Sequence, residues 1–214
     1  MTGRTAKGEL SRQRLLDAAI DGMRGSGLTG AGINEIARLG GAPKGSIYHL
    51  FPEGKTQIAC EALQAYAETV VAFIDASIPA RKSPRGQVEA LFEAFARRLE
   101  ASGCRRSCAV GAVSTDLGDD AGPVRAGAGA AFGRWIDHLA GRFDFIADPA
   151  RARSFAGLVL SCIEGAYLRG RAESSGAAFR EAGRWLGELA EQAAAPSGSK
   201  GARAPRGRPP SRKR

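Results

Sequence analysis

Apolar residues recur every three or four positions along most of the chain, which is the spacing of one face of an α-helix. Strand signals are scarce, because there are few runs of β-branched residues and little apolar–polar alternation. Glycines separate the periodic segments, within which Ala, Leu, Glu and Arg dominate, and this composition favours helix. The pattern predicts an all-α protein of about nine helices, over residues 11–24, 33–39, 43–51, 55–74, 87–101, 107–117, 125–143, 151–168 and 177–194.

The two ends of the chain differ from this helical pattern. Residues 1–9 are polar and predict a loose arm, after which Ser11 can cap the first long helix. From residue 196 onwards Pro, Gly, Ser and basic residues replace the apolar periodicity, which predicts a disordered tail. We therefore divide the chain into a three-helix N-terminal domain (1–54), a larger helical domain (55–195) and the tail (196–214).

The net charge of +9 is unevenly spread. Seven basic residues and no acidic ones lie between Pro196 and Arg214, so a net charge of +2 remains for the rest. By itself this tail indicates only an anionic partner. Arg206 and Arg208, in Pro-Arg-Gly-Arg-Pro, resemble the core of an AT-hook, which places arginines in a narrow A·T minor groove. The alternative is a solubilising tail that attracts phosphates without specificity.

The four cysteines, Cys60, Cys104, Cys108 and Cys162, are not arranged in Cys-x-x-Cys pairs. Because no apolar run is long enough to span a membrane and the N-terminus has no secretory leader, we expect a cytoplasmic protein with reduced thiols. Cys104 and Cys108 are four residues apart and would share a helix face. We expect these cysteines to be small buried side chains, with a redox or metal role as the alternative; no histidine accompanies them as a metal ligand.

Two segments resemble nucleotide-binding loops of enzymes but lack their context. Gly25–Gly30 matches G-x-G-x-x-G, yet a helical pattern precedes it where that fingerprint needs a strand. Gly54–Thr56 ends like a phosphate-binding loop, yet its first glycine is replaced by His49. The other histidine, His138, lies among polar neighbours in a predicted helix and is expected at the surface. Without a nucleophile–base pair or a metal set, we expect no catalytic residue, no cofactor, no metal and no enzyme activity.

The segment 33–51 has the spacing of a helix-turn-helix corner. A small residue, Ala37, allows the two short helices to approach closely, and Gly41, four residues later, can leave the first helix in a left-handed conformation. Six residues further on, Ile47 would point back into the corner. Four more apolar residues would complete a small core with the first long helix: Ile33, Ile36, Ala42 and Phe51.

The second short helix would expose polar side chains. Pro43 suits its first turn, where an N–H is not needed. Lys and Ser donate hydrogen bonds to phosphates or base edges, Tyr and His add contact area, and Gly45 allows close approach. Lys55 would add a cation to the positive end of the next helix. We expect DNA contacts from Lys44, Gly45, Ser46, Tyr48, His49 and Lys55. A solvated helix face without a partner is the alternative.

These residues resemble the TetR family of bacterial transcription regulators. The resemblance covers about residues 11–60 and rests on INEIARLGG, PKGSIYHLF and the Gly-Lys that follows. APKGSIYHLFPEGK together with SCAVGAVSTD, residues 107–116, resembles the LmrA/YxaF-like branch. The chain departs from the family pattern twice. Pro43 stands where many relatives have a capping Ser or Thr, and Gly30–Gly32 offers a weak cap to the preceding helix.

The resemblance implies a DNA-binding domain, a helical ligand domain and a homodimer built on the last two long helices, with 155–167 and 179–189 as the dimer faces. We expect a repressor that binds a pseudo-palindromic operator in double-stranded DNA at the nucleoid and has no membrane partner. A small, largely apolar or aromatic inducer would release it by tilting the long helix that begins at Lys55. The alternative is an architectural DNA-binding protein that uses its tail and responds to no small molecule.

The ligand site is predicted from an apolar stripe that also suits plain core packing. Aromatic and Cys side chains in the larger domain would line a site for a flat, mostly apolar molecule. The predicted ligand contacts are Phe92, Phe95, Leu99, Cys108, Trp135, Phe155, Val159 and Cys162.

Overall fold

The computed structural model describes residues 6–80, 82–119 and 121–195. Within these ranges it has nine α-helices and no strands, which confirms the all-α prediction. The predicted tail contacts, Arg206 and Arg208, and residues 1–5 of the arm lie outside the described residues. The helices are α1 (Ala6–Gly30), α2 (Ile33–Gly40), α3 (Lys44–Leu50), α4 (Gly54–Ser77), α5 (Pro84–Ala101), α6 (Ala109–Ser114), α7 (Gly122–Arg142), α8 (Pro149–Ala172) and α9 (Ala177–Ala194).

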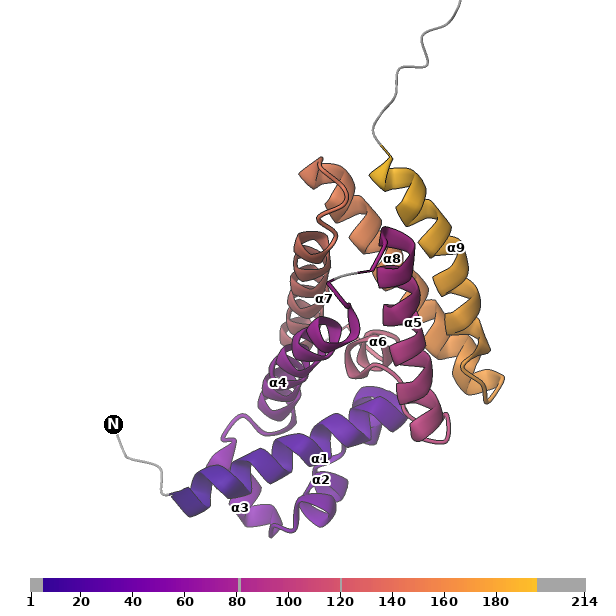
Figure 1. Cartoon of the computed structure of the whole chain (residues 1–214). Helices are drawn as coiled ribbons and strands as arrows, with labels where there is room; N and C mark the ends of the chain where they lie inside the picture. The colour runs from indigo at the N-terminus through magenta and orange to yellow at the C-terminus, as the bar shows by residue number, and fades with distance from the viewer. Residues whose placement is uncertain (1–5, 81, 120, 196–214) are drawn as a thin grey trace, which may run out of the picture.

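The helices form two layers (Figure 1). α1, α2 and α3 make the lower layer, and α4 rises from it into the group formed by α5 to α9. One hydrophobic core runs through both layers, because buried residues of α4 contact both ends of it. Ile58 of α4 is buried near the lower helices, and Tyr66 meets Trp135 of α7 edge-to-face at 6.2 Å between ring centroids. Among the described residues, no helix has both the length and the apolar content that a membrane crossing requires.

The start of α1 differs from its prediction. The helix begins at Ala6, so residues 6–9 are helical rather than a loose arm, and Ser11 lies inside the helix instead of capping it. The upstream Ala, Lys, Glu and Leu have high helix propensity, which extends the helix past a residue that is able to cap. The predicted stop is confirmed as a break: Ser26 has φ −145° and ψ 25°, and Gly27 has φ 65° and ψ −158°.

The starts of α5 and α8 lie earlier than the apolar stripes suggested. α5 begins at Pro84, and the Ser83 hydroxyl accepts a hydrogen bond from the Gly86 N–H at 3.1 Å. α8 begins at Pro149, and the Asp148 carboxylate accepts from two N–H groups of the first turn. Both are a capping residue followed by a proline, a helix-start signal that apolar periodicity does not include.

The prediction that Cys104 and Cys108 share a helix face is wrong. Cys104 follows α5 with a left-handed φ of 57°, and Cys108 is the N-cap of α6, where its Sγ accepts from the Gly111 N–H at 3.4 Å. Gly103, with φ 62°, ends the helix between them. A helical spacing of two residues therefore does not place them on one face when a glycine turn intervenes.

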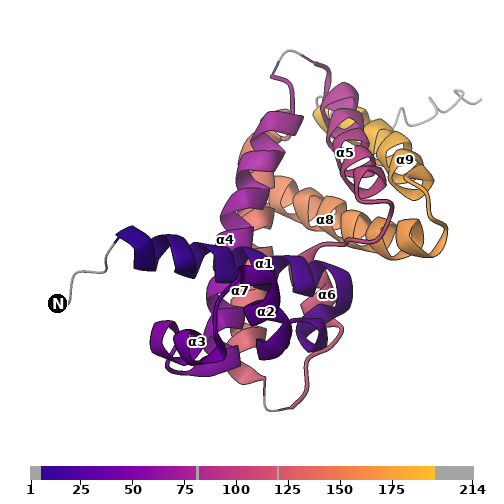
Figure 2. The ribbon, with the colours of Figure 1, turned by 90° about the horizontal axis from the view of Figure 1, so that it is seen from below.

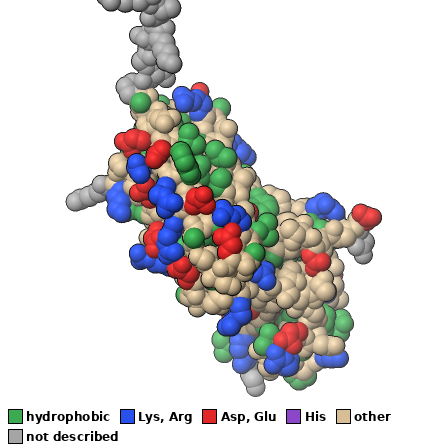
Figure 3. Space-filling view, turned by 90° about the vertical axis from the view of Figure 1, so that its right-hand side faces the viewer, with side chains coloured by type: hydrophobic (Ala, Val, Ile, Leu, Met, Phe, Trp, Pro, Cys, Tyr) green, Lys and Arg blue, Asp and Glu red, His purple; other side chains and the backbone are tan. Residues whose placement is uncertain are grey.

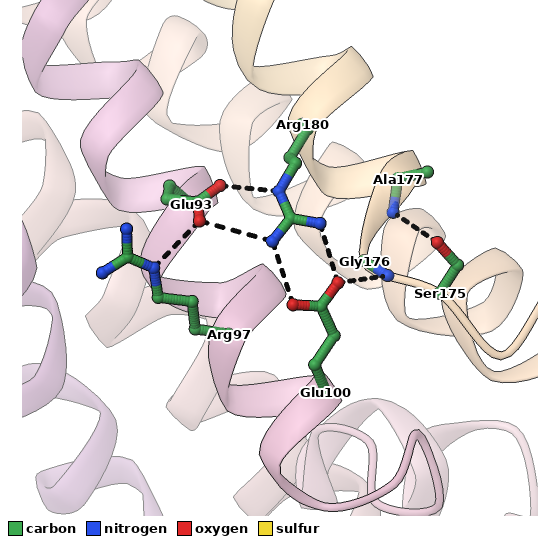
Figure 4. A network of polar contacts seen from close by, with 7 residues as sticks. All are labelled: Glu93, Arg97, Glu100, Ser175, Gly176, Ala177 and Arg180. Carbon is green, nitrogen blue, oxygen red and sulfur yellow. Dashed lines mark hydrogen bonds and ion pairs between the residues drawn. The ribbon is translucent and has the colours of Figure 1, made fainter.

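α9 packs closely against α5, and hydrogen bonds between charged side chains join the two helices. A Cβ added at Gly183 would be 2.7 Å from the Phe92 Cβ, so a side chain at 183 would push the helices apart. Figure 4 shows Arg180 of α9 between Glu93 and Glu100 of α5. Hydrogen bonds from Arg180 lower the pKa of both carboxyls. This network fixes α9 on α5 at the edge of the molecule.

Candidate DNA interface and ligand site

The predicted corner between α2 and α3 is present. Gly41 caps α2 with φ 64° and ψ 34°, and the Ala42 N–H donates to the Ala37 carbonyl at 3.0 Å. No heavy atom lies within 4 Å of a Cβ added at Gly41, so glycine is required there by backbone conformation and not by space. Ala37 and Ile47 are buried, as predicted.

Sequence reasoning missed the packing role of Gly40. A Cβ added at Gly40 would lie 2.7 Å from Leu15 Cδ2 and 3.3 Å from Leu15 Cα, so α2 can approach α1 only because residue 40 has no side chain. The Gly-Gly pair therefore has two functions: Gly40 allows close helix contact and Gly41 allows the left-handed turn. The doubled glycine in the sequence was the available signal.

The helix starts in this region are weakly capped, as the two departures from the family pattern predicted. Gly32 and Pro43 are the N-caps of α2 and α3, and neither provides a side-chain hydrogen bond. Pro43 is therefore the cap and not the first residue of the helix, which corrects the predicted start. Its carbonyl accepts from the Ser46 N–H at 3.0 Å, so the first turn of α3 is closed by the backbone alone.

α3 presents most of the predicted DNA-contacting residues to solvent. Lys44, Gly45 and His49 are exposed, Tyr48 is 56% exposed and Ser46 is half-buried. Figure 2 shows α3 at the outer side of the lower layer, away from α5 and α9. That these six residues contact DNA stays a prediction. Four of them are exposed enough to reach DNA, and Ser46 and Lys55 are half-buried.

Lys55 is half-buried in the first turn of α4, close to a carboxylate of another layer. Hydrogen bonds from Thr29 are the main cause of a lowered pKa of Asp116, and the charge of Lys55 lowers it further. Lys55 thus lies between the predicted DNA side and the end of α6.

Arg12 was not singled out from the sequence but supports the corner. Its guanidinium lies 4.5 Å above the centre of the Phe51 ring and forms an ion pair with Glu61 of α4. Phe51 is fully buried where α3 meets α4, so Arg12 connects α1 to the start of α4 through a cation–π contact and a charge pair.

The predicted ligand residues do not converge on one space. Phe95, Cys108 and Trp135 line a cavity at the centre of the upper layer, together with Tyr66, Glu164 and Tyr167. The centre of a water-sized sphere can move through only about 10 Å³ of this cavity, which is room for about one water molecule. Phe92 and Phe155 do not line this cavity. Phe92 packs on Phe179 with 6.5 Å between ring centroids, and Phe155 packs on Phe143 with 5.4 Å between ring centroids. Leu99, Val159 and Cys162 are likewise outside the residues that line the cavity.

A larger hollow lies between the break in α1, α6 and α8, and sequence reasoning missed it. Its volume on the same measure is about 510 Å³. Two hydrogen bonds to α1 lie beside this hollow. The Ser107 N–H donates to the Arg24 carbonyl at 2.9 Å, and the Arg171 side chain donates to the Gly25 carbonyl at 3.0 Å. Glu164, half-buried at the back, lines both the hollow and the central cavity.

His138 lies on α7, as predicted, but is half-buried. Its Nε2 is 2.9 Å from Asp75 Oδ1 of α4. It therefore links two helices and is remote from α3.

Comparison with known proteins identifies the family. The model of the LmrA/YxaF-like transcriptional regulator C-terminal domain matches residues 84–185. An uncharacterized HTH-type transcriptional regulator of Mycobacterium tuberculosis is 36% identical over 168 residues, which cover 75% of this chain and 84% of the relative. The chain belongs to the TetR family of transcriptional regulators. It is a DNA-binding transcriptional regulator, and its C-terminal domain is similar to that of the LmrA/YxaF-like regulators.

Further TetR-family comparisons agree. LmrA of Bacillus subtilis is 27% identical over 159 residues, covering 74% of this chain and 85% of LmrA. A crystal structure of regulatory protein TetR from Rhodobacter sphaeroides has a TM-score of 0.72 at 23% identity, covering 84% of this chain and 98% of that one. At that identity the structural match shows the fold alone.

TetR-family regulators bind DNA operators and dimerise, and this TetR-family chain exposes apolar side chains on its last two helices. Figure 3, which views the side of the molecule where α9 lies, shows hydrophobic side chains among charged ones on this face. The exposed fraction is 67% for Trp185 and 64% for Leu168; Leu158 and Leu189 are also exposed. Residues 155–167 and 179–189 stay the predicted dimer faces.

Proposed function

We propose that this TetR-family protein is a sequence-specific repressor that leaves its operator when a small, largely apolar or aromatic ligand binds. The observation that carries the proposal is the division of α3: Ile47 is fully buried in the corner, whereas Lys44, Tyr48 and His49 are exposed on the outer side. A seven-residue helix that is held by its apolar side and exposes a cation and two ring side chains is suited to read a major groove.

The DNA-bound form in this proposal is a homodimer. Each chain offers one recognition helix, and two of them would enter successive major grooves about 34–36 Å apart on a pseudo-palindromic site. The exposed Leu158, Trp185 and Leu189 support α8 and α9 as the interface, because large apolar side chains are stabilised when a partner removes them from water. Lys44, Gly45, Ser46, Tyr48, His49 and Lys55 would contact the operator.

Release by a ligand would act through α4. This helix carries Lys55 near its first residue and Tyr66 at the central cavity, so a change around Tyr66 is transmitted to the DNA side by a continuous helix. A coupling free energy of about 1–3 kcal/mol would weaken operator binding about 5–150-fold. We accordingly assign 1–54 to DNA binding, 55–195 to ligand binding and dimerisation, and place the regulator in the cytoplasm with the chromosome.

The test compares binding of the full chain to DNA selected from a random pool. Footprinting should show one twofold site, and Lys44→Ala and Tyr48→Ala should each weaken binding about tenfold, the effect of losing about 1–2 kcal/mol of contact free energy. Lys82→Ala, an exposed lysine outside the lower layer, is the control and should leave affinity unchanged. Unchanged affinity for both α3 variants would remove the recognition role of α3, and uniform coating of any duplex would favour the architectural alternative.

A further inference from the structure

We propose that the hollow between the break in α1, α6 and α8 is the ligand's polar site, and that Glu164 there binds the ammonium group of a cationic ligand with an aromatic or apolar body. This inference rests on the proposed function and names the ligand class for it. The established family membership does not specify either the place or the charge of the ligand.

The size of the two spaces favours the hollow over the central cavity. The hollow has about 510 Å³, within the range of about 300–1,000 Å³ usual for small-molecule sites. The central cavity, with about 10 Å³, admits no organic ligand unless its walls move. Glu164 and Tyr167 line both spaces and so separate them. A ligand that fills the hollow would contact these two side chains.

The charges around the hollow leave Glu164 without a counterion. Three charged residues line it, and among the described residues neither of the other two forms an ion pair with Glu164: Asp116 accepts from Thr29 Oγ1 at 2.6 Å, and Arg171, still a cation, donates to the Gly25 carbonyl. Within the described part of the chain Glu164 has no ion pair, and its polar partner is the weakly donating thiol of Cys108. A half-buried carboxylate without a paired cation is less stable than one in water, so a ligand that brings a positive charge gains binding free energy here.

Two arginines lie near Glu164 without pairing with it in the described part of the chain. Arg24 of α1 and Arg98 of α5 lower the pKa of Tyr167, against a larger rise caused by burial. Among the described residues, neither arginine forms an ion pair with Glu164: Arg24 donates to the Ser107 carbonyl at 3.1 Å, and Arg98 lies 4.7 Å above the Phe73 ring. Burial of Glu164 raises the pKa of its carboxyl to about 7. At neutral pH a bound ammonium group would therefore favour the ionised form.

The shape of the site suits an amine on an aromatic body. A Cβ at Gly111 would collide with the Glu164 carboxylate, so the missing side chain of α6 is the space in which this carboxylate lies. The Tyr167 hydroxyl is buried and has no hydrogen-bond partner among the described residues, which leaves a second polar atom for a ligand. Phe132 and Tyr167 supply aromatic walls, and aromatic faces attract cations.

A ligand in the hollow would also touch the DNA-binding layer directly. Gly25, Ser26 and Gly27 of the α1 break form part of its wall. A Cβ at Gly27 would be 3.0 Å from the Ala112 carbonyl, so α1 and α6 are in close contact beside the hollow. An occupant that separates them would shift α1, which carries α2 and α3.

The experiment uses two probes that differ in charge and share an aromatic body, 1-naphthylmethylamine and 1-naphthalenemethanol. Calorimetry at pH 7.5 on the full chain should show the amine binding at least about tenfold more tightly than the alcohol. Glu164→Gln should lower amine affinity at least about tenfold and change alcohol affinity by less than about twofold, as expected for loss of one half-buried ion pair. Glu173→Gln, an exposed glutamate near the end of the same helix, is the matched control and should change neither affinity.

Equal affinities of the two probes, or amine affinity unchanged by Glu164→Gln, would overturn the proposal. Gly111→Ala gives a second readout, since it should displace the carboxylate and weaken amine binding in a chain whose helical circular dichroism is retained. Footprints separate this proposal from the proposed function. If the amine binds through Glu164 and the footprint persists, the site stands and release by this ligand fails. If the alcohol removes the footprint as readily as the amine, release stands and the charge assignment fails.

Discussion

The α5–α9 contact and the α1–α6 contact join helices that are far apart in the sequence, but they are built differently. At α5–α9, Gly183 lets the helices touch and Arg180 bridges two glutamates. At α1–α6, hydrogen bonds such as Ser107 to Arg24 surround a hollow whose back wall includes an unpaired carboxylate. Close-packed contacts resist displacement, whereas a hollow can be filled. The difference suggests that the first contact holds the fold and the second is able to respond.

The largest expected effect concerns the unpaired carboxylate. The pKa of Glu164 is about 7 in the folded chain and about 4.3–4.5 when unfolded. Between these values the folded state binds the extra proton, so wild-type stability falls as the pH rises from about 4.5 to 7 and is level above. Glu164→Gln removes this fall, and relative to wild type its free energy of unfolding should rise by about 2–3 kcal/mol between pH 4 and pH 8.

Urea titrations at several pH values measure this difference. Glu173→Gln should follow the wild-type curve closely, because Glu173 is exposed and its ion pair with Arg169 lies at the surface, where such pairs contribute little. Parallel curves for wild type and Glu164→Gln would mean that the carboxylate is neutralised or solvated. The α1–α6 contact would then not differ from the α5–α9 contact by an unpaired charge.

The next effect tests close packing at α5–α9. Gly183→Ala should lower the free energy of unfolding by about 1–2 kcal/mol, because the added methyl would overlap Phe92. Gly129→Ala on α7 is the matched control: no heavy atom lies within 4 Å of its added Cβ, and alanine has the higher helix propensity. It should stabilise the chain by about 0.5–1 kcal/mol. Shifts of the same sign in thermal or urea unfolding would show that α9 is not closely packed at residue 183.

The smallest effect concerns the network in Figure 4. Arg180→Ala should lower the free energy of unfolding by about 1 kcal/mol at pH 7, since the ion pairs are partly solvated. Arg180 lowers the pKa of Glu93 and Glu100 in the folded chain. Its contribution is therefore present above the unfolded glutamate pKa and is lost as the pH falls through the folded values. Variant and wild type should converge in acid, below the usual glutamate pKa.

Arg97→Ala is the control for that measurement. Among the described residues Arg97 forms an ion pair with Glu93 and none with Glu100, and it is more exposed than Arg180, so its removal should have a smaller effect. An equal loss for the two variants would indicate that the network acts by general surface charge and not by bridging α5 and α9.

The corner was predictable from sequence because its determinants are local. Ala37, Gly41 and Ile47 lie within eleven residues, and each has a size or backbone requirement that its residue type reveals. The hollow was not predictable because residues near 25, 111 and 164 meet only in the folded chain. Glu164, a lone acidic residue in the apolar run Phe155–Tyr167, was the available signal. Apolar periodicity predicted the helices that carry the proposed ligand contacts, but it did not predict which of their side chains face a cavity.

The length of α4 sets how much movement the DNA end would experience. Lys55 and Tyr66 are eleven positions apart, which at about 1.5 Å per residue is a lever arm of about 16 Å. A rotation of about 5° around the Tyr66 end moves the Lys55 end by about 1.4 Å, and in a symmetric pair the two displacements add. A small rearrangement at the central cavity would thereby displace the DNA contacts by more than the distance tolerance of a hydrogen bond in the grooves.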